Sequence, residues 1–196
     1  MQQDTRLPLS IPGAWLVRPG PEHLAEGLAA LDAGWSADTL RGAAAAREEA
    51  EALRRDPAAW MARSDDPVGE GLVTLPDGSQ AQRLPWMRRW IWDGGFCGSI
   101  NLRWQPGTAE LPPHVLGHIG YAVVPWRRGR GLASAALAAM LGPARALGLP
   151  WVELTTDDDN LASQRVIARN GGALVERFTK PAAYGGHTGQ RWRIPL

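Results

Sequence analysis

The sequence has little of several features that mark whole classes of protein. Its 196 residues include one cysteine, Cys97, which excludes an internal disulfide and indicates a reducing compartment. Residues 1–13 lack a charged start followed by an apolar run, so we expect no signal peptide. No apolar run is long enough to cross a membrane. These absences predict a cytoplasmic protein with no membrane partner.

Net charge of one sign is also scarce. The chain carries 21 Lys and Arg residues against 20 Asp and Glu residues, a formal charge of +1, so we expect no long-range attraction to nucleic acid. Positive charge does gather locally at Arg127, Arg128 and Arg130, which favours a small anionic ligand. Hydrophobic residues make up 44% of the chain, enough for a core. We expect a tail over residues 1–13 and one domain over residues 14–196.

The spacing of apolar residues predicts alternating strands and helices. Ser36 is the expected cap of the second helix, Asp93-Gly94-Gly95 is the expected turn of an antiparallel hairpin, and a Pro-Asp-Gly turn is expected at residues 76–78. Gly142-Pro143 predicts a kink or break in the expected helix over residues 130–147. The expected strands are 14–19, 83–92, 96–104, 117–124, 151–156, 173–179 and 190–196. The expected helices are 22–34, about 37–55, 130–147 and a last one that Asp159 or Asn160 caps and that runs through Arg169.

The stretch PWRRGRGLASAAL, residues 125–137, joins an expected strand to an expected helix. A strand, a glycine-rich turn and a helix form an arrangement that binds phosphate. Glycine at positions 129 and 131 lets the backbone approach an anion without a Cβ clash. The backbone amides of residues 128–134 and the helix dipole would then face the ligand.

Several ligands could use such a turn. A Walker A loop needs a Gly-Lys dipeptide, which the sequence lacks, so that motif is excluded. A dinucleotide loop needs G-x-G-x-x-G, and the segment that starts at Gly129 has Ser134 in the third place. Glu153 follows the glycine-rich segment at about the sequence separation at which dinucleotide-binding proteins have a ribose-binding acid. A dinucleotide oxidoreductase therefore stays an alternative. A basic turn that only caps a helix is the other alternative.

Two motifs resemble the GNAT acetyltransferase superfamily. Residues 128–133, RGRGLA, match its R/Q-x-x-G-x-G/A signature, and residues 160–172, NLASQRVIARNGG, resemble N-x-x-S-x-x-V/L-x-x-K/R-x-G. One helix and one strand separate the two motifs, as in that family. Within it, the segments look most like the branch of ribosomal-protein alanine acetyltransferases and their bacterial relatives.

The resemblance implies an α/β fold in which helices flank a mixed, mostly antiparallel sheet, with a splayed parallel pair formed by strands 117–124 and 151–156. It implies acetyl-CoA as cosubstrate and no metal. The backbone of Val123 would stabilise the developing oxyanion. The residues expected to contact the cosubstrate are Val123, Val124, Arg128, Gly129, Arg130, Gly131, Leu132, Ala133, Ser134, Asn160 and Ser163.

Few side chains are candidates for proton transfer. His118 and Glu153 are the candidate bases. The alternatives are that His118 is a packed or surface histidine and that Glu153 is the buried partner of an arginine. Asp157, Asp158 and Asp159 could contact the substrate amine or form a solvated helix start. Many relatives use a tyrosine as acid where this chain has Ile167, and in the branch it resembles, the serine at Ser163 lies near the sulfur.

The resemblance predicts direct transfer of an acetyl group to a primary amine of a small molecule or protein. A module that binds acyl-CoA without turnover is the alternative from another class. Cys97 is expected to be structural, and most of the ten tryptophans to pack in the core and hairpin. A homodimer is common for folds of this kind and is kept as a prediction.

Overall fold

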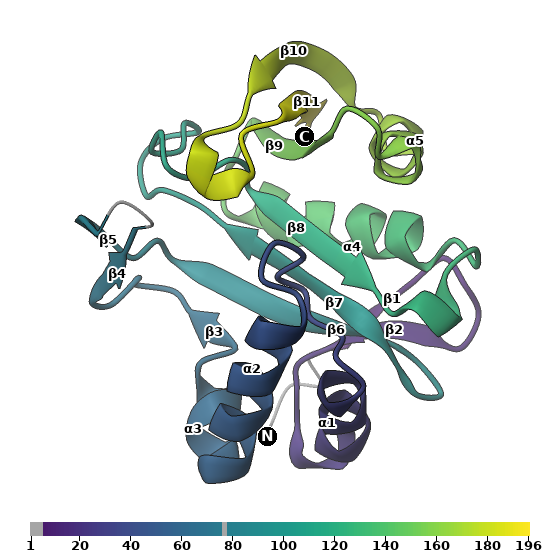
Figure 1. Ribbon diagram of the computed structural model, residues 1–196. Helices are drawn as coiled ribbons and strands as arrows, with labels where there is room; N and C mark the ends of the chain where they lie inside the picture. The colour runs from purple at the N-terminus through teal and green to yellow at the C-terminus, as the bar shows by residue number, and fades with distance from the viewer. Residues whose placement is uncertain (1–5, 76–77) are drawn as a thin grey trace. The chain divides into compact units, whose positions relative to one another are not determined.

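The computed structural model describes residues 6–75 and 78–196 (Figure 1). Residues 1–5 of the expected tail and residues 76–77 of the expected Pro-Asp-Gly turn lie outside this range. The chain forms two compact units that each draw on distant segments. The first unit comprises Met1–Asp65, Arg88–Asn101 and Tyr121–Ala139, and the second comprises Asp66–Met87, Leu102–Gly120 and Met140–Leu196. The expectation of one domain over residues 14–196 stays a prediction.

The fold class expected from the sequence is confirmed, because helices accompany sheets that are mainly antiparallel. One sheet has the strand order β1-β2-β6-β7-β8, and β3 also pairs with β6. The pairs β1–β2 and β2–β6 are antiparallel. The strands of this sheet are β1 Leu7–Pro8, β2 Ala14–Val17, β3 Asp65–Asp66, β6 Trp86–Asp93, β7 Phe96–Arg103 and β8 Ile119–Val123. The predicted hairpin, β6 and β7, is therefore present.

The helices at the start of the first unit differ partly from expectation. They are η1 Pro21–His23, α1 Leu24–Asp32, α2 Ala43–Arg55 and α3 Pro57–Ala62. The predicted start of α2 near residue 37 is wrong, because the Ser36 hydroxyl accepts a hydrogen bond from the Asp38 amide at 3.0 Å and Asp38 accepts from the amides of Leu40 and Arg41. These side chains close turns with their own backbone, which competes with helix formation.

Helix α3 was not expected from the sequence. Asp56 ends α2, and its carboxylate then accepts a hydrogen bond from the Ala59 amide at 2.9 Å. Pro57 occupies the first turn of the new helix, where its missing N–H has no consequence. The Asp-Pro pair therefore ends one helix and starts the next.

Aromatic side chains build the core of the first unit. Trp90 and Phe96 are both buried, with ring centroids 4.9 Å apart in an edge-to-face arrangement. Trp35 packs against Phe96 at 5.2 Å, and Trp60 against Trp90 at 5.6 Å. Such pairs contribute about 1 kcal/mol each beyond the area they bury. The predicted role of the tryptophans in core packing is confirmed for these residues.

The second unit contains a sheet of order β10-β11-β9, whose strands lie side by side in Figure 1. Its elements are β9 Trp151–Asp157, α5 Leu161–Arg169, β10 Ala173–Thr179, η3 Ala182–Tyr184 and β11 Thr188–Pro195. A small hairpin, β4 Leu72–Thr74 with β5 Gln80–Gln82, was not expected. The strands expected to form a splayed pair, β8 and β9, belong to different sheets, and a backbone hydrogen bond of 2.7 Å from His118 to Glu153 joins them at the residue before β8.

Helix α4 spans Leu132–Ala146 and runs through Pro143. The expected break at Gly142-Pro143 is therefore wrong, and the alternative, a kink, stays a prediction. The Leu147 amide donates to the Pro143 carbonyl at 3.1 Å, so helical hydrogen bonding resumes directly after the proline. Buried apolar side chains on both sides, Leu137, Met140, Leu141 and Ala144, stabilise the helix across this point. No helix within the described residues is long and apolar enough to span a membrane.

Gly98 of β7 lies very close to the backbone of Ala122 and Val123 in β8. Its φ is +143°, and a Cβ there would collide with the Ala122 carbonyl oxygen and lie 2.9 Å from the Val123 Cα. We expect Gly98→Ala to lower the free energy of unfolding by about 3 kcal/mol, measured by urea denaturation. Gly94→Ala is the control, because Gly94 has φ +64° but no atom within 4 Å of the added Cβ. Equal losses in the two variants would contradict the role assigned to crowding.

Candidate functional site

The glycine-rich turn connects β8 to α4 within the first unit. The chain leaves β8 at Val123, forms the short helix η2 over Pro125–Arg127, and turns before α4 begins at Leu132. Gly129 and Gly131 both have φ +76°, a conformation that other residues adopt only with strain. A Cβ on Gly129 would meet no atom within 4 Å. Backbone conformation, and not crowding, therefore requires glycine at position 129.

The residues directly before α4 lie at the surface of the first unit. Residues 128–131 are exposed, whereas Leu132 is buried and anchors the first helical turn. The Ala135 amide donates to the Gly131 carbonyl at 3.0 Å, so the amides before it precede the regular helical pattern. A helix N-terminus carries roughly half a positive charge and binds anions. Phosphate binding by this turn stays a prediction.

Two arginines of the turn bind back onto the first unit. The Arg128 Nε donates to the Val123 carbonyl at 3.1 Å, and an Arg130 guanidinium nitrogen lies 2.5 Å from the Asp93 Oδ2. The Val124 amide donates to the Cys97 carbonyl at 3.0 Å and is therefore committed to the sheet. β8 is the last strand in the order of its sheet, which leaves an edge for a ligand backbone. The oxyanion role of the Val123 amide stays a prediction.

His118 lies in the second unit and is almost fully buried, at 1% exposure. Its Nδ1 accepts a hydrogen bond from the Glu153 amide at 2.9 Å, which fixes the neutral ring with its proton on Nε2. Burial lowers the pKa of His118, although the Glu153 carboxylate and the Ala109 carbonyl act in the opposite direction. Because the ring's lone pair already serves a backbone amide, these contacts favour a structural role over that of a base.

Glu153 is also buried and is held by two arginines of β11. Its Oε1 lies 2.6 Å from an Arg193 guanidinium nitrogen, and its Oε2 lies 3.2 Å from Arg191. Arg191 additionally pairs with the exposed carboxylate of Glu176 at 2.8 Å. The structure thus brings the two candidate bases together, since the Glu153 backbone contacts the His118 ring while the Glu153 carboxylate contacts arginines. Their catalytic roles stay predictions.

The aspartates that follow β9 make ion pairs within the second unit. Asp157 accepts hydrogen bonds from Lys180 and from the His187 Nε2, and the latter is 2.7 Å long. Burial raises the pKa of Asp157, but these two donors lower it further, so the net pKa lies below its ordinary value of 3.8. Asp158 binds Gln190 and Arg177, which lower the pKa of its carboxyl group. These contacts join the ends of three strands and favour a structural role for both residues.

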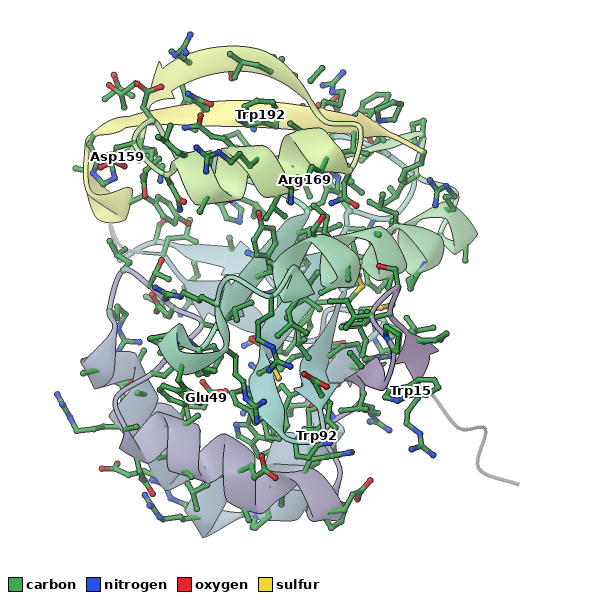
Figure 2. The ribbon with its side chains drawn as sticks, turned by 90° about the vertical axis from the view of Figure 1, so that its right-hand side faces the viewer. Trp15, Glu49, Trp92, Asp159, Arg169 and Trp192 are labelled. Atoms are coloured by element: carbon green, nitrogen blue, oxygen red, sulfur yellow. The ribbon has the colours of Figure 1, made fainter. Side chains whose placement is uncertain are left out.

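The second motif forms the start of α5. The Asn160 Oδ1 accepts a hydrogen bond from the Ser163 amide at 3.0 Å, so Asn160 is the helix cap out of the two candidates, Asp159 and Asn160. Figure 2 labels Asp159 just before this helix and Arg169 at its end. Ile167 is fully buried and offers no proton donor. The structure therefore brings Asn160 and Ser163 together, and the acid role of Ser163 stays a prediction.

Other polar groups were not anticipated from the sequence. The Tyr184 hydroxyl donates to the His114 carbonyl at 2.9 Å, which ties two loops of the second unit together. The hydrogen bonds from Lys180 and His187 to Asp157 were not predicted either, because they depend on the register between β10 and β11. Cys97 is fully buried, and burial raises the pKa of its thiol, as a structural role requires. Among the described residues, no group of His, Cys, Asp and Glu side chains could hold a metal ion.

Comparison with known proteins places this chain in a family. The profile of the family described as "Acetyltransferase (GNAT) domain" matches residues 39–173, a range that contains the turn of residues 128–134 and the capped start of α5. The chain belongs to the GNAT acetyltransferase family. No curated protein matches the sequence.

Solved structures of GNAT acetyltransferases share the fold. RimL, a ribosomal L7/L12 α-N-protein acetyltransferase solved with coenzyme A, has a TM-score of 0.63 and 16% identity over 97% of this chain and 98% of its own. RimJ of Mycobacterium smegmatis, solved with a CoA disulfide, has a TM-score of 0.60 and 19% identity over 97% and 87%. The microcin C7 self-immunity acetyltransferase MccE, solved with acetyl-CoA and AMP, has a TM-score of 0.58 and 11% identity over 95% and 94%. At these identities, the likeness extends to the fold alone.

Glu153 can be tested directly. Glu153→Gln removes the buried carboxylate that contacts both Arg191 and Arg193 and leaves Arg191 paired only with the exposed Glu176, and we expect the free energy of unfolding to fall by about 2 kcal/mol. Chemical denaturation measures this loss. Glu176→Gln is the matched control, because it removes an exposed partner of the same Arg191 and should change stability by about 0.5 kcal/mol or less. A stable Glu153→Gln variant that has lost acetyl transfer would instead identify Glu153 as a base.

Proposed function

We propose that this protein is an N-acetyltransferase that moves the acetyl group of acetyl-CoA directly to a primary amine. The turn at residues 128–131 carries the proposal, because its left-handed glycines and exposed helix start fit the pyrophosphate of coenzyme A. RimL, RimJ and MccE were solved with coenzyme A or a derivative of it, which supports the same ligand here. A cytoplasmic location and a homodimer stay predictions.

In the proposed reaction, the neutral amine attacks the thioester carbonyl carbon, and the C–S bond breaks as the amide forms. The carbonyl oxygen gains negative charge on the way, and the Val123 amide is the proposed donor to it. The amine loses a proton and the departing CoA thiolate gains one. Asn160 would contact the cosubstrate or the acceptor while it caps α5.

The acceptor's own pKa decides how much a base contributes. His118 and Glu153 are the candidate bases. The His118 Nδ1 already accepts a hydrogen bond from the Glu153 amide, and the Glu153 carboxylate is bound by Arg191 and Arg193. An α-amine titrates near pH 8 and a lysine side chain near 10.4, so roughly one in ten α-amines but fewer than one in a thousand lysine amines is neutral at pH 7. A site with little base assistance therefore suits an α-amine better than a lysine, and the acceptor panel should contain both.

A second candidate function is an acyl-CoA-binding module without turnover. The engaged lone pair of His118, the arginine-bound carboxylate of Glu153 and the buried Ile167 in place of a tyrosine acid favour it. The phosphate-binding turn would serve either function equally. Turnover, and not binding, therefore separates them.

Calorimetric titration with acetyl-CoA, CoA and NAD tests the ligand, and a thiol-release assay with a panel of amines tests the reaction. We expect binding of both CoA species, no binding of NAD, and thiol release with at least one amine. Binding without release across the panel would favour the non-catalytic module. Failure to bind any CoA species would overturn both functions.

Gly131 offers a sharper version of the binding test. Gly131→Val forces a branched residue into φ +76° and places its side chain beside the exposed amides, so we expect acetyl-CoA affinity to fall by more than tenfold. Gly148→Val is the matched control, since Gly148 has the same φ and flanks the other end of α4. Both variants should lose similar stability in thermal unfolding. Equal loss of affinity in the control would contradict a direct role for the turn.

Ser163 is the proposed proton donor to the departing thiolate. We expect Ser163→Ala to lower kcat by about tenfold to a hundredfold, at the low end of general acid contributions because a thiolate also leaves unaided. KM for acetyl-CoA should change little. The control is Ser134→Ala, on the cosubstrate-binding turn, which should alter KM more than kcat. Unchanged kcat in Ser163→Ala would remove this residue from the reaction.

A further inference from the structure

The turn between β6 and β7 contacts the phosphate-binding turn within the first unit. An Arg130 guanidinium nitrogen lies 2.5 Å from the Asp93 Oδ2, and the Val124 amide donates to the Cys97 carbonyl at 3.0 Å. The Arg127 guanidinium lies 3.2 Å from the point where a Cβ on Gly95 would sit. Residues 93–97 and residues 124–130 therefore meet at three places along their length.

The Asp93 carboxylate is the fixed partner in this contact. Asp93 ends β6, pairs with Ala14 of β2, and its side chain is 18% exposed, whereas that of Arg130 is 47% exposed. The turn is held further by α1, because the Phe96 amide donates to the Glu26 Oε2 at 2.7 Å. A carboxylate anchored on a sheet thus binds a long, flexible side chain that projects from a turn with two left-handed glycines.

The contact restrains a turn that is rich in glycine. Glycine gives the backbone its left-handed conformation but also the greatest freedom to leave it. Ordering a loop when the ligand binds would subtract from the affinity, so a turn that is already ordered binds more tightly. Arg130 lies between Gly129 and Gly131, and holding its guanidinium restrains the peptide groups on both sides.

We propose that Asp93 is a positioning residue for cosubstrate binding: by holding Arg130, it fixes the backbone of residues 129–131 in the conformation that binds the CoA pyrophosphate. This inference rests on the proposed function. Asp93 touches no substrate atom in this scheme and acts through Arg130.

The direction of the effect separates positioning from simple electrostatics. A carboxylate near an anion site repels the ligand, so electrostatics alone predicts that removing its charge tightens binding. Positioning predicts the opposite, because a released Arg130 leaves the turn free to sample other conformations. The sign of the change in acetyl-CoA affinity in Asp93→Asn therefore decides between the two.

The experiment is calorimetric titration of the full chain and its variants with acetyl-CoA, together with thermal unfolding. We expect Asp93→Asn and Arg130→Gln each to weaken binding by about threefold to tenfold, the range of a partly exposed ion pair and the order it imposes. The double variant should bind acetyl-CoA no more weakly than whichever single variant binds it less tightly, because both substitutions remove the same ion pair between Asp93 and Arg130. Asp93→Glu, which keeps the carboxylate, should restore most of the affinity.

Asp32→Asn is the matched control. Asp32 forms an ion pair of 2.6 Å with Arg54 on the surface of the same unit, and its loss should leave acetyl-CoA affinity unchanged. Tighter or unchanged binding by Asp93→Asn, multiplied losses in the double variant, or an equal loss in the control would each overturn the proposal. Where Asp93→Asn does not fold, Arg130→Gln and Asp93→Glu carry the test. A wild-type chain that binds no acetyl-CoA would overturn the proposed function itself, which these outcomes do not.

Discussion

The backbone conformation at Gly129 and Gly131 is the constraint on which the candidate site depends. Both residues adopt φ +76° at the point where the chain leaves β8 and enters α4. A side chain at either position would strain that conformation, in which residues 128–131 are exposed. Buried Leu132 anchors the helix directly behind the turn, so the direction of the amides follows from two glycines and one apolar contact.

Features that depend on neighbouring residues were predictable from the sequence. The cap at Asn160, the hairpin turn after β6 and the glycine-rich turn before α4 each follow from a few adjacent residues with strong backbone preferences. The start of α2 was misplaced because Ser36 and Asp38 can serve either a helix or a turn, and the sequence pattern does not say which amide they bind. The β4–β5 hairpin was missed because its strands are only three residues long.

The candidate site also contains features that local sequence predicts and features that depend on the fold. The turn at residues 128–134 was found from its glycine pattern, and the motif at residues 160–172 from its resemblance to a family signature. Both were visible because each lies on one continuous segment. The partners of His118 and Glu153 could not be found, since they depend on which residues of β11 face Glu153 across the sheet. The link between Asp93 and Arg130 joins residues 37 positions apart and required the fold. Such contacts leave no signal in a local pattern.

The ion pair between Lys180 and Asp157 has a consequence for the protein's own chemistry. Lys180 is the only lysine in the sequence, where arginine supplies every other basic side chain apart from histidine. Its side chain is 12% exposed, and its ammonium group is bound to the Asp157 carboxylate. Guanidinium groups do not react with thioesters at neutral pH because they remain charged. A protein with the proposed function thus offers its acyl donor one lysine amine, that of Lys180, and this amine is paired with a carboxylate.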